Sequence, residues 1–454
     1  MLRVHVTAAV VLLFGLEAAH PAHAQPSSTT NRDDPLALIA EANRMAASDL
    51  WPGFDARTFP VAIFDGQRTF LFRHPSPPPG FAPLPGAPGV LVMPGRAEEV
   101  TANTSATIGG VRTATLMPAS AATPLRNRAG ILIHETFHVF QRDHHKGWSA
   151  NEAELFTYPV SDTTQVVMQR EELEALRRAL IAKRGAGACW ARIAMDMRGR
   201  RLAMLPKGAA QYERMTELNE GLATYVEKRA VGVADRNLLS ETRFAPDMVR
   251  SRAYQSGVAI ARLLDRYSPS WRSTIESNDS TALDALLANA VSSTSRGSCG
   301  FSVSERAGFT TNAAADVAAL VTRRESARRE FLGKAGWSLL IVSAASPLFP
   351  QGFDPLNVQV VTPGEILHTR FVKLGNDAGS IQVLGRASLT AAAGAHPLFN
   401  GVKQLTVTGL SSAPDVIVRG DTVTINAEGI SGEFRRASVQ RENQRVTVTL
   451  SPAT

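Results

Sequence analysis

The stretch from Ile131 to Phe140 constrains this chain more than any other, because it places the pattern H-E-x-x-H inside an apolar run. On an α-helix, His134 and His138 lie one turn apart on the same face, so both imidazoles can bind one ion. Their neighbours are apolar nearly all round, which predicts a buried helix. Buried histidines without partners carry a heavy desolvation cost, and a zinc ion removes it. Glu135 can reach an attacking water as a general base without binding the metal.

A catalytic zinc needs three protein ligands and one open position. The best candidate for the third ligand is Glu220, because the adjoining Gly221 and Ala223 are small enough to let a second helix approach the first. Glu217 lies on the same face. It is an alternative ligand, a partner for one of the histidines, or a surface charge.

His144 is a different candidate for the third ligand. It stands where the pattern H-E-x-x-H-x-x-G-x-x-H of the metzincin proteases has its last histidine. That pattern needs a glycine for a sharp turn, whereas this chain has Gln141, which favours a continuing helix. We therefore expect His144 to point away from the metal, and His145 and Asp143 to be surface residues.

With these two segments the chain resembles the gluzincin metallopeptidases, the clan of thermolysin and aminopeptidase N. The likeness rests on the H-E-x-x-H pattern and on the N-E-G-L-A segment around Glu220, and covers about residues 130–270. The resemblance implies His134, His138 and Glu220 as zinc ligands, Glu135 as the base, and a peptide or protein as substrate. A longer segment separates the two ligand helices here than in the best-known members, and its pattern predicts helices.

Peptide hydrolysis also needs a donor for the oxyanion that develops on the scissile carbonyl. Gluzincins often use a tyrosine or histidine downstream of the third ligand, so the resemblance points first to Tyr254 and then to Tyr225. The other histidines lie beside turn residues far from the motif, and we expect them to be solvated or locally hydrogen-bonded. They are His74, His368 and His396.

The N-terminus resembles that of an exported protein. A short basic start, an apolar run and the small-residue site Ala22-His23-Ala24 predict a signal peptide over residues 1–24. The apolar run is too short to span a bilayer, and no later run is longer, so we expect a periplasmic or secreted protein without a membrane span. In such a compartment Cys189 and Cys299 are expected to form a disulfide, two buried free thiols being the alternative.

The formal net charge of +7 comes from scattered arginines rather than from a basic stripe interleaved with aromatic residues. We therefore expect no nucleic-acid partner. A basic surface is compatible with acidic substrates or with an anionic cell envelope.

The residue patterns predict an α+β protein. A small N-terminal α/β part covers 25–125, a mainly helical zincin-like catalytic region 126–335, and an all-β domain 336–454. In the first part we expect a helix over 35–50, a hairpin over 61–72, and a strand over 101–112 that either pairs with the substrate backbone or is an ordinary edge strand.

Apolar residues at helical spacing predict the helices of the middle region, and a period of two predicts strands after residue 336. The expected helices cover 164–183, 189–204, 212–230, 248–267 and 313–331. Gly420 and Asp421 are expected to form a two-residue hairpin turn in a sandwich or barrel.

We therefore predict an exported zinc metallopeptidase that hydrolyses peptide bonds through a zinc-activated water, with Glu135 as general base. One alternative is a zinc-stabilised envelope binding protein whose β domain is the working part. Another is a metal-dependent hydrolase of a non-peptide bond.

Overall fold

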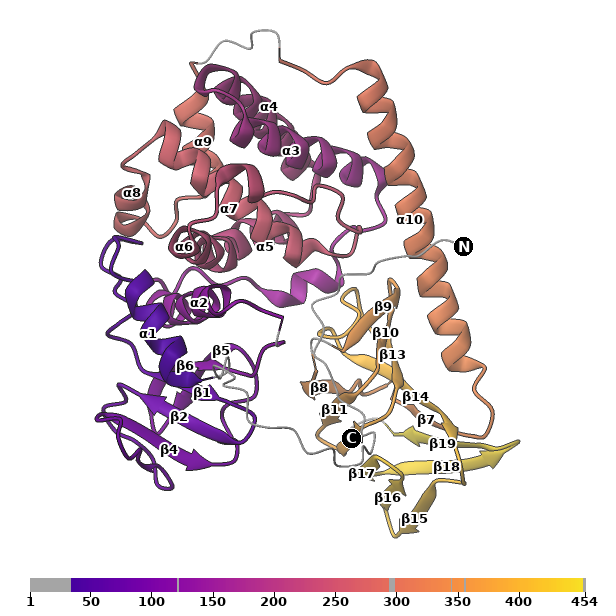
Figure 1. Ribbon diagram of the computed structural model, residues 1–454. Coiled ribbons are helices and arrows are strands. Elements are labelled where there is room, and N and C mark those ends of the chain that lie inside the picture. Colours follow the sequence, from indigo (N-terminus) through magenta and orange to yellow (C-terminus); the bar gives the residue numbers. More distant parts are fainter. Residues whose placement is uncertain (1–33, 121, 294–298, 344, 355–356, 452–454) are drawn as a thin grey trace, which may run out of the picture.

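The computed structural model describes residues 34–120, 122–293, 299–343, 345–354 and 357–451, and the expected signal peptide lies outside them. Helices fill the middle of the described chain, a sheet with one helix precedes them, and a domain of strands follows (Figure 1). The α+β class expected from the sequence is confirmed. Among the described residues, no helix is both long enough and apolar enough to cross a membrane.

The N-terminal part is α1 (Pro35–Met45), which packs on α2 (Leu125–His144), followed by a six-stranded sheet. Its strands are β1 (Val61–Phe64), β2 (Arg68–Phe72), β3 (Ala82–Pro83), β4 (Val90–Pro94), β5 (Thr104–Ile108) and β6 (Val111–Leu116). They lie in the order β3-β4-β2-β1-β6-β5, so β5 forms an edge of the sheet. The expected hairpin over 61–72 is confirmed, with Val61 opposite Phe72. Helix α1 is shorter than expected, since it ends at Met45.

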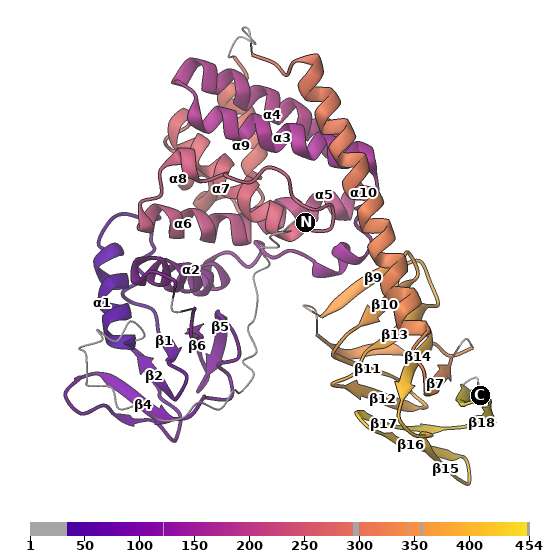
Figure 2. The same ribbon diagram turned by 45° about the vertical axis from the view of Figure 1, so that its right-hand side comes forward.

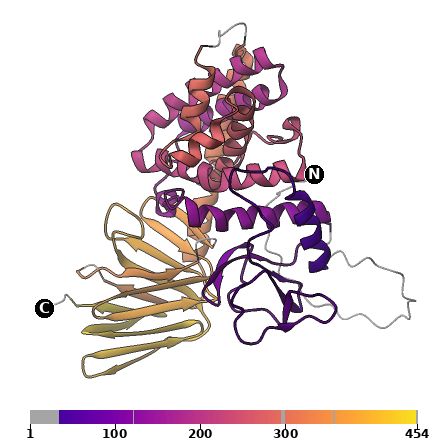
Figure 3. The same ribbon diagram turned by 90° about the vertical axis from the view of Figure 1, so that its left-hand side faces the viewer.

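The helical region lies above this sheet, and α2 separates the two (Figure 3). Its helices are α2 (Leu125–His144), α3 (Thr163–Ile181), α4 (Arg184–Met204), α5 (Lys207–Thr216), α6 (Leu222–Val231), α7 (Val249–Tyr267), α8 (Trp271–Ser277), α9 (Leu283–Val291) and α10 (Val303–Leu332), with the short turns η1 (Glu152–Phe156), η2 (Glu217–Gly221) and η3 (Asp235–Asn237). As expected, the segment after α2 is helical, and α3 and α4 form a hairpin.

Three elements of this region differ from the expectation, and one of them is α4, which begins at Arg184 rather than at residue 189. The stretch 212–230 is not one regular helix, because the π-helical turn η2 interrupts it between α5 and α6. Helix α10 begins earlier than predicted. Ser302 and Glu305 form a capping box there, in which each side chain bonds to the other residue's backbone N–H and so satisfies a free donor of the first turn.

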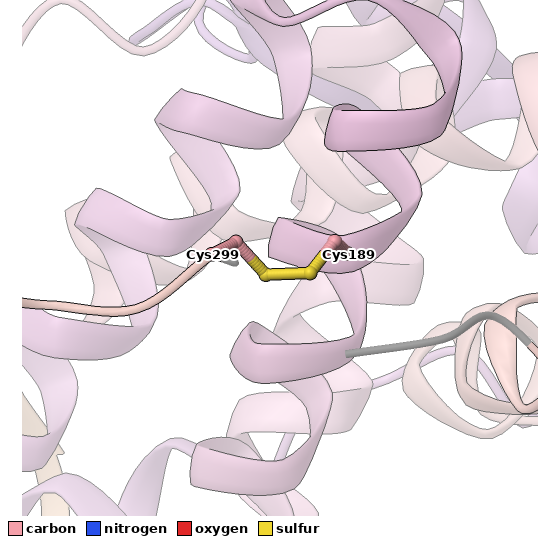
Figure 4. The surroundings of a disulfide bond; sticks show 2 residues. All are labelled: Cys189 and Cys299. Atoms are coloured by element: carbon pink, nitrogen blue, oxygen red, sulfur yellow. A yellow bond between two sulfur atoms is a disulfide. The ribbon is translucent and has the colours of Figure 1, made fainter. Parts of the chain in front are cut away.

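A disulfide joins Cys189 of α4 to Cys299, just before α10 (Figure 4). The Cα atoms are 6.3 Å apart, within the usual range for a disulfide. The expected disulfide is confirmed, and it links the α3–α4 hairpin to the segment before α10.

The C-terminal domain is a β-sandwich. Its strands are β7 (Trp337–Val342), β8 (Phe349–Phe353), β9 (Val358–Thr362), β10 (Glu365–His368), β11 (Phe371–Asn376), β12 (Gly379–Leu384), β13 (Ser388–Ala392), β14 (Val402–Leu410), β15 (Asp415–Arg419), β16 (Thr422–Ala427), β17 (Ile430–Arg435), β18 (Ala437–Glu442) and β19 (Arg445–Leu450). One sheet has the order β18-β19-β7-β14-β13-β10-β9 and the other β15-β16-β17-β12-β11-β8. Leu339 and Val407 of the first sheet share a core with Val372 and Ile425 of the second. The hairpin turn at Gly420–Asp421 is confirmed.

Helix α10 runs from the helical region down to the β domain (Figure 2). Near its C-terminus, Arg328 donates to Glu365 of β10, and Phe331 packs in a small cluster with Val361 and Leu367. The turn η1 contacts the same domain through Phe156, whose ring packs against Phe353 and Phe399. The two regions are thus joined by α10 on one side and by η1 on the other.

Candidate metal centre

The structure brings together two histidines of α2 and one glutamate of η2. Helix α2 continues through Gln141 to His144, so His134 and His138 lie on one face as the motif predicts. His134 Nε2 and His138 Nε2 are 3.0 Å apart, and Glu220 Oε2 lies 3.5 Å from the first and 3.2 Å from the second. The side chains are only 11 to 13% exposed.

These distances match the spacing of a tetrahedral zinc site. Ligand atoms at 2.0–2.1 Å from zinc in a regular tetrahedron are about 3.3–3.4 Å apart. The three donors lie within a few tenths of an ångström of that separation. Two imidazole nitrogens and one carboxylate oxygen are also a donor set that zinc accepts. The residues present therefore fit a zinc ion with three protein ligands.

Glu220 reaches this position although it lies 82 residues after His138. The cause is local packing of η2 against α7: a Cβ atom added to Gly221 would lie 2.8 Å from the Cα of Gly257. The expectation that Gly221 lets this segment approach the first ligand helix is wrong, because its close neighbours belong to α7. Helices α2 and α6 approach instead at Gly130, where a Cβ would lie 2.5 Å from Val231 Cγ2.

Polar side chains outside the donor group lie beside the Nδ1 atoms of the two histidines. Gln141 Oε1 lies 2.8 Å from His138 Nδ1, and the Gln141 amide nitrogen donates to the carbonyls of Leu218 and Asn219 in η2, at 2.9 Å each. Gln141 therefore ties one ligand helix to the turn that carries the third ligand. Partners of this kind fix the tautomer and orientation of metal-binding histidines.

Glu227 of α6 lies beside the other histidine: its Oε2 is 3.3 Å from His134 Nδ1, within ion-pair distance but without hydrogen-bond geometry. Neither Gln141 nor Glu227 was identified from the sequence. Both positions were open to prediction, because Gln141 is one helical turn after His138 and Glu227 is two turns after Glu220.

The electrostatics of the centre favour a positive charge. Burial lowers the pKa of His134, but the nearby carboxylates of Glu220 and Glu227 outweigh it and raise the pKa to about 10. Burial raises the pKa of Glu220, and the two histidines outweigh it and hold the pKa well below its usual range. The carboxylates thus compensate a cation placed among them.

Glu135 is buried beside this group and is 7% exposed. Burial raises its pKa, while His134 and His138 lower it less strongly. A carboxylate whose proton affinity is increased by its surroundings is better suited to accept a proton at neutral pH than an exposed one.

Arg250 and Tyr254, one turn apart on α7, lie on the other side of Glu220. Arg250 Nη2 donates to Glu220 Oε1 at 2.7 Å, and Arg250 Nε lies 3.1 Å from the Tyr254 hydroxyl. Arg250 was not identified from the sequence. Burial, followed by the charge of Glu220, raises the pKa of Tyr254, so its hydroxyl keeps its proton. The hydroxyl of Tyr225 instead donates to Asp265, at 2.9 Å.

Of three neighbouring residues, His144 and Asp143 lie as expected and His145 does not. His144 stays outside the donor group and its Nδ1 lies 2.9 Å from the carbonyl of Phe140. His145 is not a surface residue: it is 4% exposed and stacks on Trp148 at 3.8 Å between ring centroids. Asp143 pairs with Arg112 on the surface.

Glu217 is neither a ligand, nor a surface charge, nor a partner of the histidines. It belongs to a buried ion-pair network in which Arg198 donates to Glu217 at 2.5 Å and to Glu172 at 2.7 Å, and Arg201 donates to Glu213 at 2.7 Å. Removing one member of such a network leaves a buried charge uncompensated, at a cost of about 3–5 kcal/mol. The network thereby holds η2, and with it Glu220, against α4.

Comparisons with protein-family models, with curated proteins and with solved structures found no match for this chain.

Proposed function

We propose that the chain is an exported zinc-dependent metallopeptidase with a gluzincin-type site. The observation that carries the proposal is the convergence of His134, His138 and Glu220 at the separation of tetrahedral zinc ligands, with Glu135 buried beside them. Zinc in such a site supplies Lewis-acid polarisation of a carbonyl and of the attacking water. A disulfide supports an oxidising compartment and therefore export.

In this proposal each residue near the centre has a defined role. Glu135 takes a proton from the attacking water and passes it to the leaving amine. Tyr254, held by Arg250, donates a hydrogen bond to the oxyanion that forms on the scissile carbonyl. Gln141 and Glu227 orient the histidines.

The edge strand β5 supplies a surface for the substrate backbone. It packs against α2, and Arg142 Nη1 donates to the carbonyl of Ser105 at 3.2 Å. An extended peptide that adds to this edge gains main-chain hydrogen bonds while lying along the helix that carries the histidines.

The first test is elemental analysis of the purified protein as wild type, Glu220→Ala and His144→Ala. We expect one zinc per chain, lost in Glu220→Ala and kept in His144→Ala, which is the matched control because it removes a histidine of the same helix. Loss only in His144→Ala would contradict the ligand set, and a wild type without zinc after reconstitution would contradict the centre itself.

The second test is hydrolysis of a mixed peptide library by wild type and Glu135→Gln. We expect cleavage by wild type only, with zinc retained in the variant. Normal turnover by Glu135→Gln would exclude the proposed base. A zinc-loaded wild type that cleaves only esters or other non-peptide bonds would show a hydrolase of a different substrate class. No hydrolysis at all would favour a binding protein.

A further inference from the structure

A cavity of about 280 Å³ lies between the helical region and the β domain. Phe156 of η1 and Val249 of α7 line one side, and Phe353, Val358 and Phe399 of the β domain line the other. Phe353 and Phe399 are 6.0 Å apart between ring centroids, and Phe156 packs edge-on against both. The apolar wall is therefore aromatic and is built from both parts of the chain.

A chain of hydrogen bonds links the cavity to the candidate metal centre. Glu152 lines the cavity and accepts a hydrogen bond from Arg250, which also donates to Glu220. Val249, in the apolar wall, directly precedes Arg250 in α7. Arg250 therefore contacts one residue of the cavity and one residue of the metal centre.

Among the described residues, the charges that line the cavity and their partners leave one cation in excess. Of the two carboxylates that line it, Glu152 pairs with Arg250, and Asp247 pairs with Arg323 at 2.9 Å. Arg324 also lines the cavity and is half-buried, yet no hydrogen bond or ion pair joins it to any residue that the structure describes. Its Nε is fully buried without an acceptor. A half-buried guanidinium of this kind favours a carboxylate, which it can bind through two parallel hydrogen bonds.

We propose that this cavity binds the C-terminal residue of a peptide substrate, with Arg324 receiving the terminal carboxylate and the phenylalanine cluster the last side chain. A carboxylate and an apolar side chain on the same residue occur only at the end of a peptide. An internal acidic residue uses its side chain for the carboxylate and brings no apolar group. The inference rests on the proposed peptidase function, since it assigns part of the substrate of that site.

The test is a binding measurement on the inactive full-length Glu135→Gln protein. The probes are a short fluorescent peptide ending in phenylalanine, as free acid and as amide. We expect the free acid to bind at least about tenfold more tightly than the amide, the effect of one charge-assisted hydrogen-bonding pair. The difference should vanish when Arg324→Gln is added. It should be kept with Arg329→Gln, which removes an exposed arginine of the same helix, and partly restored with Arg324→Lys.

Equal binding of acid and amide to the parent protein, or an equal loss with Arg329→Gln, would overturn the proposal. Tight binding of an amide peptide that carries an internal aspartate would overturn the assignment to the C-terminus. The result is separable from the proposed function. Binding that depends on Arg324, without cleavage by zinc-loaded wild type, would leave the cavity site standing and refute the peptidase. Cleavage with an unchanged KM in Arg324→Gln would support the peptidase and refute the cavity site.

Discussion

Replacing Gly221 by alanine tests whether the contact between η2 and α7 positions the third ligand. The added Cβ would lie 2.8 Å from the Cα of Gly257, whereas carbon atoms in contact are about 3.5–4.0 Å apart. The obstacle is backbone, which cannot rotate aside, so the two helices must separate by about 0.7 Å or more. Overpacking of this kind costs about 1–3 kcal/mol, and the better helix propensity of alanine offsets at most about 1 kcal/mol.

The same displacement changes the metal centre, because Glu220 is the adjacent residue. Metal–ligand distances tolerate deviations of only about 0.2 Å, so a shift of this size weakens zinc binding. We expect Gly221→Ala to lose about 1–2 kcal/mol of unfolding free energy and to bind zinc more weakly. Urea unfolding and a competitive chelator titration measure the two effects.

Gly199→Ala is the matched control. Gly199 lies exposed inside α4, and a Cβ there would meet nothing within 4 Å. The same substitution should therefore stabilise the protein by about 0.5–1 kcal/mol and leave zinc binding unchanged. Wild-type stability and zinc affinity in Gly221→Ala would refute the reasoning, as would equal effects of the two substitutions.

Three further predictions concern other parts of the chain. Glu227→Gln should lower zinc affinity about 10- to 100-fold without unfolding the protein; chelator titration measures this, and an unchanged affinity would remove Glu227 from the centre. Burial lowers the pKa of His368 from 6.5 to about 4, so the β domain should lose about 3 kcal/mol of stability as pH falls from 6.5 to 4 and keep it above 6.5. Denaturant unfolding measured across that range should show an unfolding free energy that falls as the pH falls, and His368→Gln should reduce this slope. Parallel plots of unfolding free energy against pH for the wild type and the variant would contradict the prediction. Cys189→Ser removes a cross-link between residues 110 positions apart, so the unfolding free energy of the helical region should fall by about 2–5 kcal/mol. The unfolding transition of the β domain should not change.

Much of the architecture was predictable because it depends on neighbouring residues. The H-E-x-x-H spacing and its apolar flanks are local properties of one helix, and α2 carries both histidines on one face as expected. The hairpin turn at Gly420–Asp421 and the change to a period of two after residue 336 are local in the same way. The pairing of Cys189 with Cys299 followed from there being only two cysteines.

The errors arose where a side chain meets a distant part of the chain. His145 looks like a surface residue in sequence, but it packs on Trp148 and lies near Asp279 and Glu276, more than a hundred residues away. Glu217 was undecided for the same reason, since its partner Arg198 lies on another helix.

The sequence by itself determined which residues can act as donors and which helix presents two of them, because helical periodicity acts over a few residues. Only the tertiary structure decided how Glu220 reaches them, through the close contact of Gly221 with Gly257 and the bonds of Gln141 to η2. It also decided that Arg324 faces a cavity completed by the β domain. Such contacts depend on how whole helices and sheets pack, and packing between segments far apart in the chain leaves no periodic signal in the sequence.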